Sequence, residues 1–167
     1  IPTKEWPTND ELFDMIKDDE GADVEFKGCF RYPIIGVKMR KKSAWMKYNC
    51  TRAVASFLNT RGGYLFIGVE DKTLNLTGIN RENYPSHEKA KAAVLDYMTR
   101  ALGVRADKYI EAKVIVPEGE IVEIMVLKVM RAAHYFTMEF CQFDEQGDGS
   151  AIQKSKRPGA FFVRGNE

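Results

Sequence analysis

A short apolar run at residues 64–69 is the feature that most constrains the fold of this chain. It reads Tyr-Leu-Phe-Ile-Gly-Val, and a continuous apolar run of this length is typical of a strand that is buried on both faces. Gly62 and Gly63 precede the run, and glycine is common just after the end of a helix. The pattern therefore predicts a central strand that follows directly on a helix.

Three segments with helical periodicity accompany this strand. The first spans about residues 9–18, where Thr8 and Glu11 have the spacing of a capping box. The second spans about residues 44–59, with apolar residues recurring at steps of three and four. The third spans about residues 86–102 and begins at a serine suited to cap it. We therefore expect about three helices.

Further strands are expected between and after these helices. A turn around residues 117–120 predicts a hairpin of two strands. The expected strands are 24–30, 112–116, 121–129, 135–143 and 160–164. This order predicts an α+β domain with a mixed, mainly antiparallel sheet. The length favours one domain over residues 1–167, and a fragment of a larger protein is an open alternative because the first residue is Ile.

Charge is distributed unevenly along the chain. Residues 1–25 hold nine acidic residues and two lysines, whereas residues 26–69 hold nine basic residues and no acidic one. The formal net charge of the whole chain is only +1, because these two blocks nearly cancel and the remaining residues are nearly balanced. A concentrated positive field attracts phosphate groups and speeds encounter with nucleic acid.

Aromatic residues are interleaved with this basic block, and such side chains can stack on unpaired bases. The aromatic residues are Phe30, Tyr32, Trp45 and Tyr48. The candidate nucleic-acid-binding residues are Lys27, Lys38, Arg40, Lys41, Lys42, Lys47 and Arg52. The block favours contact with nucleic acid, but a solvated basic face and a surface that meets an acidic partner stay open as alternatives.

Several other classes of protein are not supported. The cysteines are three, far apart and without a C-x-x-C pair, so neither a disulfide framework nor a zinc site is expected. Reduced thiols and the lack of a signal peptide favour a cytoplasmic protein. No apolar run approaches the ~18–20 residues of a membrane helix. Neither a P-loop nor a dinucleotide fingerprint occurs, so no ATP is expected.

Acidic residues bracket the basic block. Glu20 and Glu25 precede it, and Glu70 and Asp71 follow the predicted central strand. Three carboxylates converging beside a positive groove could hold Mg²⁺ or Mn²⁺, which prefer oxygen ligands. The same acids could instead be ion-pair partners of neighbouring basic residues, among them Lys27, which would share the face of Glu25 on a strand.

Two stretches of the chain resemble the Schlafen AlbA-like domain family. The first is Glu-Gly-Ala-Asp-Val-Glu-Phe-Lys at residues 20–27. The second is residues 53–71, where a helix ending Ser-Phe-Leu-Asn-Thr-Arg-Gly-Gly leads into Tyr-Leu-Phe-Ile-Gly-Val-Glu-Asp. Weaker similarity extends to Phe-Phe-Val-Arg-Gly at residues 161–165, so the resemblance covers nearly the whole chain.

The resemblance implies an AlbA-like lobe that binds RNA or DNA. Animal members cleave structured RNA such as transfer RNA with two Glu, one Asp and a divalent metal, and by motif position these acids are Glu20, Glu25 and Asp71. A metal-dependent endoribonuclease holding Mg²⁺ or Mn²⁺ is therefore expected. A non-catalytic regulatory module with structural acids is the alternative. Because animal members pair two such lobes, a homodimer or a larger chain is also expected.

Overall fold

The computed structural model describes residues 1–31, 39–137, 140–141 and 153–154, with the backbone alone at 39–45, 81 and the last two segments. The three α-helices are α1 (Asn9–Lys17), α2 (Met39–Leu58) and α3 (His87–Leu102). Two 3-10 helices are η1 (Asn80–Glu82) and η2 (Val104–Tyr109). The strands are β1 (Val24–Lys27), β2 (Gly63–Ile67), β3 (Ile110–Ile115), β4 (Ile124–Val129), β5 (Phe140–Cys141) and β6 (Gln153–Lys154).

Four of the strands form one mixed sheet in the order β1-β2-β4-β3. The outer strand β1 runs parallel to β2, with Glu25 opposite Leu65, and the other two pairings are antiparallel. The short strands β5 and β6 pair separately. The expected α+β fold with a mainly antiparallel sheet is thus confirmed, as is the β3–β4 hairpin.

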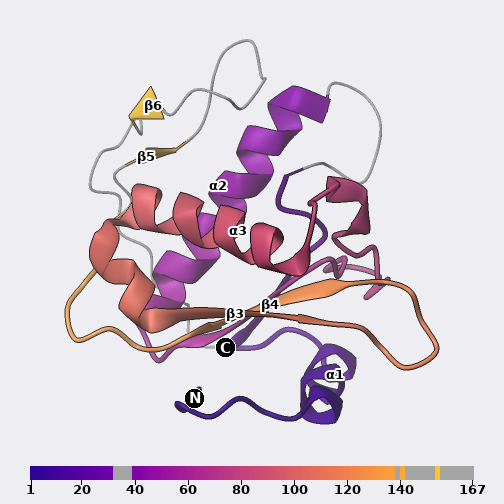
Figure 1. Cartoon of the computed structure of the whole chain (residues 1–167). Coiled ribbons are helices and arrows are strands. Elements are labelled where there is room, and N and C mark those ends of the chain that lie inside the picture. Colours follow the sequence, from indigo (N-terminus) through magenta and orange to yellow (C-terminus); the bar gives the residue numbers. More distant parts are fainter. Residues whose placement is uncertain (32–38, 138–139, 142–152, 155–167) are drawn as a thin grey trace.

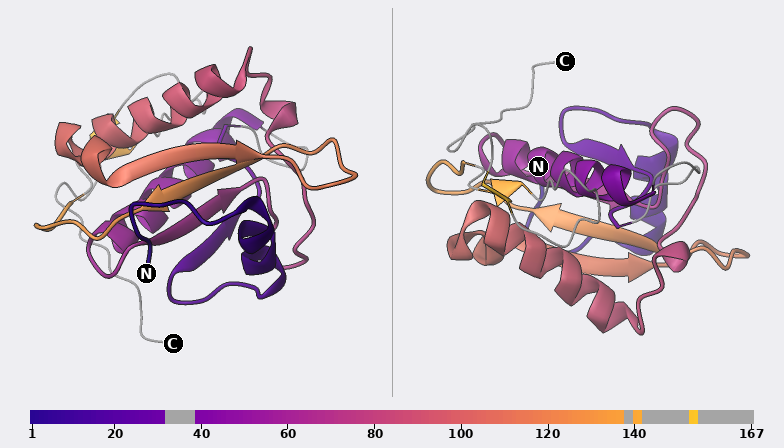
Figure 2. Two further views of the ribbon diagram at one scale, coloured as in Figure 1. Left: turned by 60° about the horizontal axis from the view of Figure 1, so that its bottom comes forward. Right: turned by 90° about the horizontal axis from the view of Figure 1, so that it is seen from above.

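Helices cover both faces of the sheet. Figure 1 shows α2 and α3 on one side of the strands and α1 on the other, and Figure 2 shows the same layers from two further directions. Side chains of β2 alternate between the two cores, because successive residues of a strand point to opposite faces. Leu65 and Ile67 pack in the core beneath α2 and α3, whereas Tyr64 and Phe66 pack in the core of α1.

The start of α2 differs from the sequence-based prediction. The helix begins at Met39 rather than near residue 44, so residues 39–43 extend it instead of forming part of a connection. The physical reason is that Arg and Lys have high helix propensity, which a run of basic residues conceals from a pattern based on apolar spacing. The basic segment therefore enters the fold as a helical turn.

The strands also differ at several ends. Strand β1 ends at Lys27 instead of residue 30, and its pairing with β2 stops at the same residue. Gly28 follows directly, and glycine weakens a strand because it has no side chain to pack. The strand expected at 135–143 is represented by β5 alone, and residues 135–137 are not part of it. Residues 138–139, 142–143 and the strand expected at 160–164 lie outside the described residues, as does the similar string at 161–165.

A close approach of two glycines shapes the carboxyl end of β2. Gly68 has a φ of 104°, and a Cβ atom on it would lie 2.8 Å from the Cα atom of Gly78. The amide of Gly68 donates to the carbonyl of Lys27 at 2.7 Å, which keeps the ends of β1 and β2 together. Glycine is needed here because a side chain would both strain the backbone and collide with Gly78.

Candidate nucleic-acid interface and carboxylate cluster

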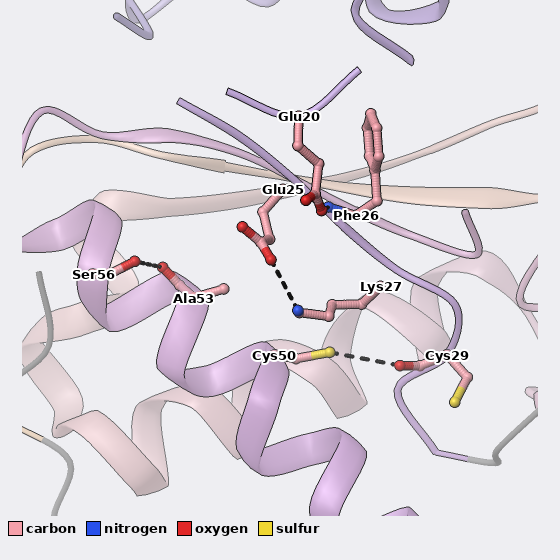
Figure 3. Close-up of polar contacts among 8 residues, drawn as sticks. All are labelled: Glu20, Glu25, Phe26, Lys27, Cys29, Cys50, Ala53 and Ser56. Atoms are coloured by element: carbon pink, nitrogen blue, oxygen red, sulfur yellow. Dashed lines mark hydrogen bonds and ion pairs between the residues drawn. The ribbon is translucent and has the colours of Figure 1, made fainter. Parts of the chain in front are cut away.

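Glu20 directly precedes the tight turn that leads into β1. Its Oε1 accepts a hydrogen bond from the backbone N–H of Phe26 at 2.8 Å, so the carboxylate is fixed against the edge strand of the sheet (Figure 3). The turn itself is closed by a hydrogen bond from the amide of Gly21 to the carbonyl of Val24. The carboxylate of Glu20, which precedes β1 in the sequence, therefore lies beside the middle of that strand.

Glu25 and Lys27 lie on one face of β1 and form an ion pair. The Nζ atom of Lys27 is 2.9 Å from Oε1 of Glu25, and their side chains are only 17% and 14% exposed. Figure 3 shows both side chains on the side of the strand that faces α2, near Cys50. The two-residue spacing had predicted this shared face. In this arrangement, Lys27 neutralises Glu25.

Asp71 stands on an exposed turn that follows β2. The turn is closed by two backbone hydrogen bonds between Glu70 and residues 74 and 75, each 2.9 Å long. Because β1 and β2 are parallel, the carboxyl ends of the two strands lie next to each other. Asp71 therefore lies at the edge of the sheet where Lys27 ends β1.

Electrostatic coupling connects these acids. Burial raises the pKa of Glu20 above its ordinary value of 4.5, and the negative charges of Glu25 and Asp71 raise it further. The N–H of Phe26 and the ammonium of Lys27 act in the opposite direction but do not cancel the rise in pKa. Glu20, Glu25 and Asp71 thus lie close enough for their charges to interact, with Lys27 among them.

Glu20, Glu25 and Asp71 are suitable ligands for a divalent ion, but their side chains are not arranged to share one. Three carboxylates supply the oxygen ligands that Mg²⁺ and Mn²⁺ prefer. Within the described part of the chain, however, no group of three His, Cys, Asp or Glu side chains is placed to hold a metal ion. Glu25 is bonded to Lys27, and Glu20 to a backbone amide. A shared ion would require these long side chains to change rotamer.

The candidate basic residues are only partly described. Arg52 is exposed on α2, whereas Lys47 is half-buried on the same helix. Arg40, Lys41 and Lys42 lie in the first turn of α2, where the backbone alone is described, and Lys38 lies outside the described residues. Because residues five apart on a helix point in different directions, Lys47 and Arg52 do not share one face.

Glu82 makes buried contacts near Lys47 that no sequence pattern indicated. Glu82 is 1% exposed, and its Oε1 accepts hydrogen bonds from the amides of Phe30 and Arg31. Arg31 in turn donates from Nη1 to the carbonyl of Glu82 at 3.4 Å. These contacts join residues about fifty positions apart, so no local pattern could have revealed them.

Asn59 and two buried cysteines have structural roles. Asn59 bonds the backbone of Phe136 twice, donating to its carbonyl at 2.8 Å and accepting from its amide at 2.7 Å. It therefore docks a distant segment onto the end of α2. Cys29 and Cys50 are buried, and burial raises the pKa of the Cys50 thiol well above its ordinary value.

This geometry defines an α+β domain in which acidic residues lie near the shared end of two parallel strands, on a sheet covered by a helix that begins with basic residues. The chain belongs to the Schlafen family: a family model described as Schlafen, AlbA_2 matches residues 20–166. The resemblance deduced from the sequence is thereby confirmed. Membership of this family indicates a nucleic-acid-binding domain.

Comparison with solved structures gives a distant match. The DIP2311 protein from Corynebacterium diphtheriae is 16% identical, with a TM-score of 0.49. The match covers 87% of this chain but 29% of that one, so this chain spans less than a third of its length. No curated protein matches the chain. Among the described residues, none of the helices is both long and apolar enough to span a membrane.

Proposed function

We propose that this domain is a metal-dependent endoribonuclease that acts on structured RNA such as transfer RNA. The observation that carries the proposal is the electrostatic cluster of Glu20, Glu25, Lys27 and Asp71 beside the basic helix α2. Mutual repulsion of carboxylates favours binding of a proton or a cation. The choice of RNA as substrate rests on the family resemblance.

The catalytic acids in this proposal are Glu20, Glu25 and Asp71, which would hold Mg²⁺ or Mn²⁺. An ion bound there would supply Lewis-acid chemistry for phosphodiester cleavage. Glu20 is held in place by the amide of Phe26, and Asp71 by the closed turn that follows β2. These backbone contacts hold Glu20 and the turn of Asp71 near β1 and β2, and the glutamate side chains would rearrange around the ion.

Lys27 has two roles in this proposal. In the structure its ammonium compensates the charge of Glu25, which is largely buried. When a phosphate of the substrate approaches, the same ammonium can bind that phosphate, which releases Glu25 for other ligands. The basic residues of α2 would attract the remainder of the RNA backbone, and this attraction weakens as salt rises.

A non-catalytic module that binds DNA or RNA is the second candidate. The Glu25–Lys27 ion pair and the Glu20–Phe26 hydrogen bond favour it, because both acids already have structural partners. Salt-sensitive binding is expected from both candidates, whereas turnover is expected only from the first. A homodimer or a larger chain, and a cytoplasmic location, stay predictions under either candidate.

A cleavage assay separates the two candidates. Labelled transfer RNA and single-stranded DNA are incubated with the protein in Mn²⁺, Mg²⁺ or EDTA. We expect cleavage of the RNA that requires the metal and vanishes in the Glu25→Ala/Asp71→Ala double variant. The matched control is Asp107→Ala/Glu118→Ala, which removes the same charge from exposed positions. Equal binding without cleavage in wild type and double variant would establish the second candidate instead.

A further inference from the structure

A cavity of about 360 Å³ opens between the segment after β1, helix α2, the η1 turn and helix α3. It lies apart from the acids discussed above, since Glu20, Glu25 and Asp71 do not line it. Its volume falls within the roughly 300–1,000 Å³ typical of small-molecule sites. The groups that line it include Arg31, Lys47, Tyr84, Tyr97 and Arg100.

Three cations face this cavity. Lys47 is half-buried there, and burial lowers its pKa, with the positive charges of Arg31 and Arg100 adding to the effect. Glu82 acts in the opposite direction but does not cancel it. Asp96 also lines the cavity, and its Oδ2 atom lies 3.4 Å from Nη1 of Arg100. The cations therefore outnumber the carboxylates, and a bound anion would relieve their repulsion.

Aromatic rings stand next to these cations. The guanidinium carbon of Arg31 lies 5.5 Å from the centre of the Tyr84 ring, and Nζ of Lys47 lies 5.5 Å from that of Tyr97. Tyr97 is buried, whereas Tyr84 is partly exposed. A guanidinium and a tyrosine ring both offer flat surfaces on which a base can stack.

The cavity is pre-organised by buried contacts. The carboxylate of Glu82 binds the amides of Phe30 and Arg31, which fixes the segment after β1 against η1. The Phe30 ring meets that of Tyr97 edge-on, with centroids 5.5 Å apart, which ties the same segment to α3. Groups held in place before binding lose less entropy when a ligand arrives.

We propose that this cavity binds one unpaired nucleotide of the nucleic acid, with its phosphate on Lys47, Arg31 and Arg100 and its base against Tyr84. The proposal rests on the proposed function and adds a site to it. Arg31 follows Lys27 by four residues, so their Cα atoms are at most ~14 Å apart. A nucleotide held in the cavity would therefore keep the neighbouring nucleotides of the same nucleic-acid strand close to Glu20, Glu25 and Asp71.

The test uses adenosine 5′-monophosphate as the probe, titrated into the protein and followed by calorimetry. Adenosine and inorganic phosphate are titrated in parallel. We expect the nucleotide to bind about tenfold more tightly than either component, since charge-assisted and stacking contacts act together. Lys47→Met, Arg100→Gln and Tyr84→Leu should each weaken it several-fold. Lys89→Met, an exposed change on α3, is the control and should leave it unchanged.

The outcomes distinguish this proposal from the proposed function. Affinity for the nucleotide that is the same in Lys47→Met and in Arg100→Gln as in wild type would overturn the cavity proposal, even if transfer RNA still binds. Phosphate alone binding as tightly as the nucleotide would also overturn it. Nucleotide binding lost in these variants, together with no cleavage of any RNA, would support the cavity and refute the nuclease. Arg100 is largely exposed, so its variant is expected to fold.

Discussion

The pKa of Glu20 is set by effects that act in opposite directions. Its carboxylate accepts the N–H of Phe26, which favours the charged form, yet burial and the charges of Glu25 and Asp71 favour the proton. The second group of effects prevails, so the pKa of Glu20 is raised. The ionised side chain is therefore a cost to the folded state at neutral pH, as is often found at functional sites.

Replacing Glu20 with Gln tests this balance. The raised pKa means that the folded state binds the proton more tightly, so wild type loses stability as the pH rises from about 4.5 through the folded pKa. Glu20→Gln keeps an oxygen for Phe26 but carries no charge. Its free energy of unfolding should exceed that of wild type at pH 7, and the difference should shrink toward pH 4.

Urea unfolding at several pH values measures this difference. The control Glu118→Gln removes the same charge from an exposed turn and should show no such trend. A Glu20→Gln variant that is less stable than wild type at pH 7, with the deficit shrinking at lower pH, would show that the carboxylate stabilises the fold instead.

Some of these residues could be predicted from local sequence patterns and others could not. The period of two along a strand placed Lys27 with Glu25 correctly, because this relation is local. The buried Glu82 was missed, because its partners Phe30 and Arg31 lie about fifty residues away. A contact between such distant segments depends on how the helices pack.

Among the elements, α2 joins the basic segment of the chain to the core. Its first turn carries basic residues, and Asn59, which directly follows its last residue, holds the backbone of Phe136 by two hydrogen bonds. The apolar period predicted the buried half of this helix, but not its start at Met39. Helix propensity of the charged residues, rather than apolar spacing, sets that boundary.

Asn59→Ala should loosen the docked segment. The change leaves an amide and a carbonyl of Phe136 buried without partners, which costs about 2–4 kcal/mol of the free energy of unfolding. Urea unfolding measures the loss, and faster hydrogen exchange at the Phe136 amide locates it. Arg52→Ala, an exposed change on the same helix, should cost less than about 0.5 kcal/mol. Equal stabilities of the two variants would contradict this role of Asn59.

At the scale of the whole molecule, one parallel strand pair determines where the acids lie. Strands β1 and β2 run in the same direction, so Lys27 and the turn carrying Asp71 fall at one edge of the sheet. The sequence predicted a mixed sheet and the correct hairpin, but not which strands were parallel. Strand order depends on how helices cross between strands, and apolar patterns do not encode that crossing.

The most direct test of the central claim is a Mn²⁺ titration of the protein, in which electron paramagnetic resonance measures the free ion. We expect a Mn²⁺ site that Glu25→Gln and Asp71→Asn each weaken at least about tenfold. Lys27→Met should tighten it, because the ammonium competes for Glu25. An absence of Mn²⁺ binding, or binding unchanged in the Glu25 and Asp71 variants, would contradict a shared carboxylate centre.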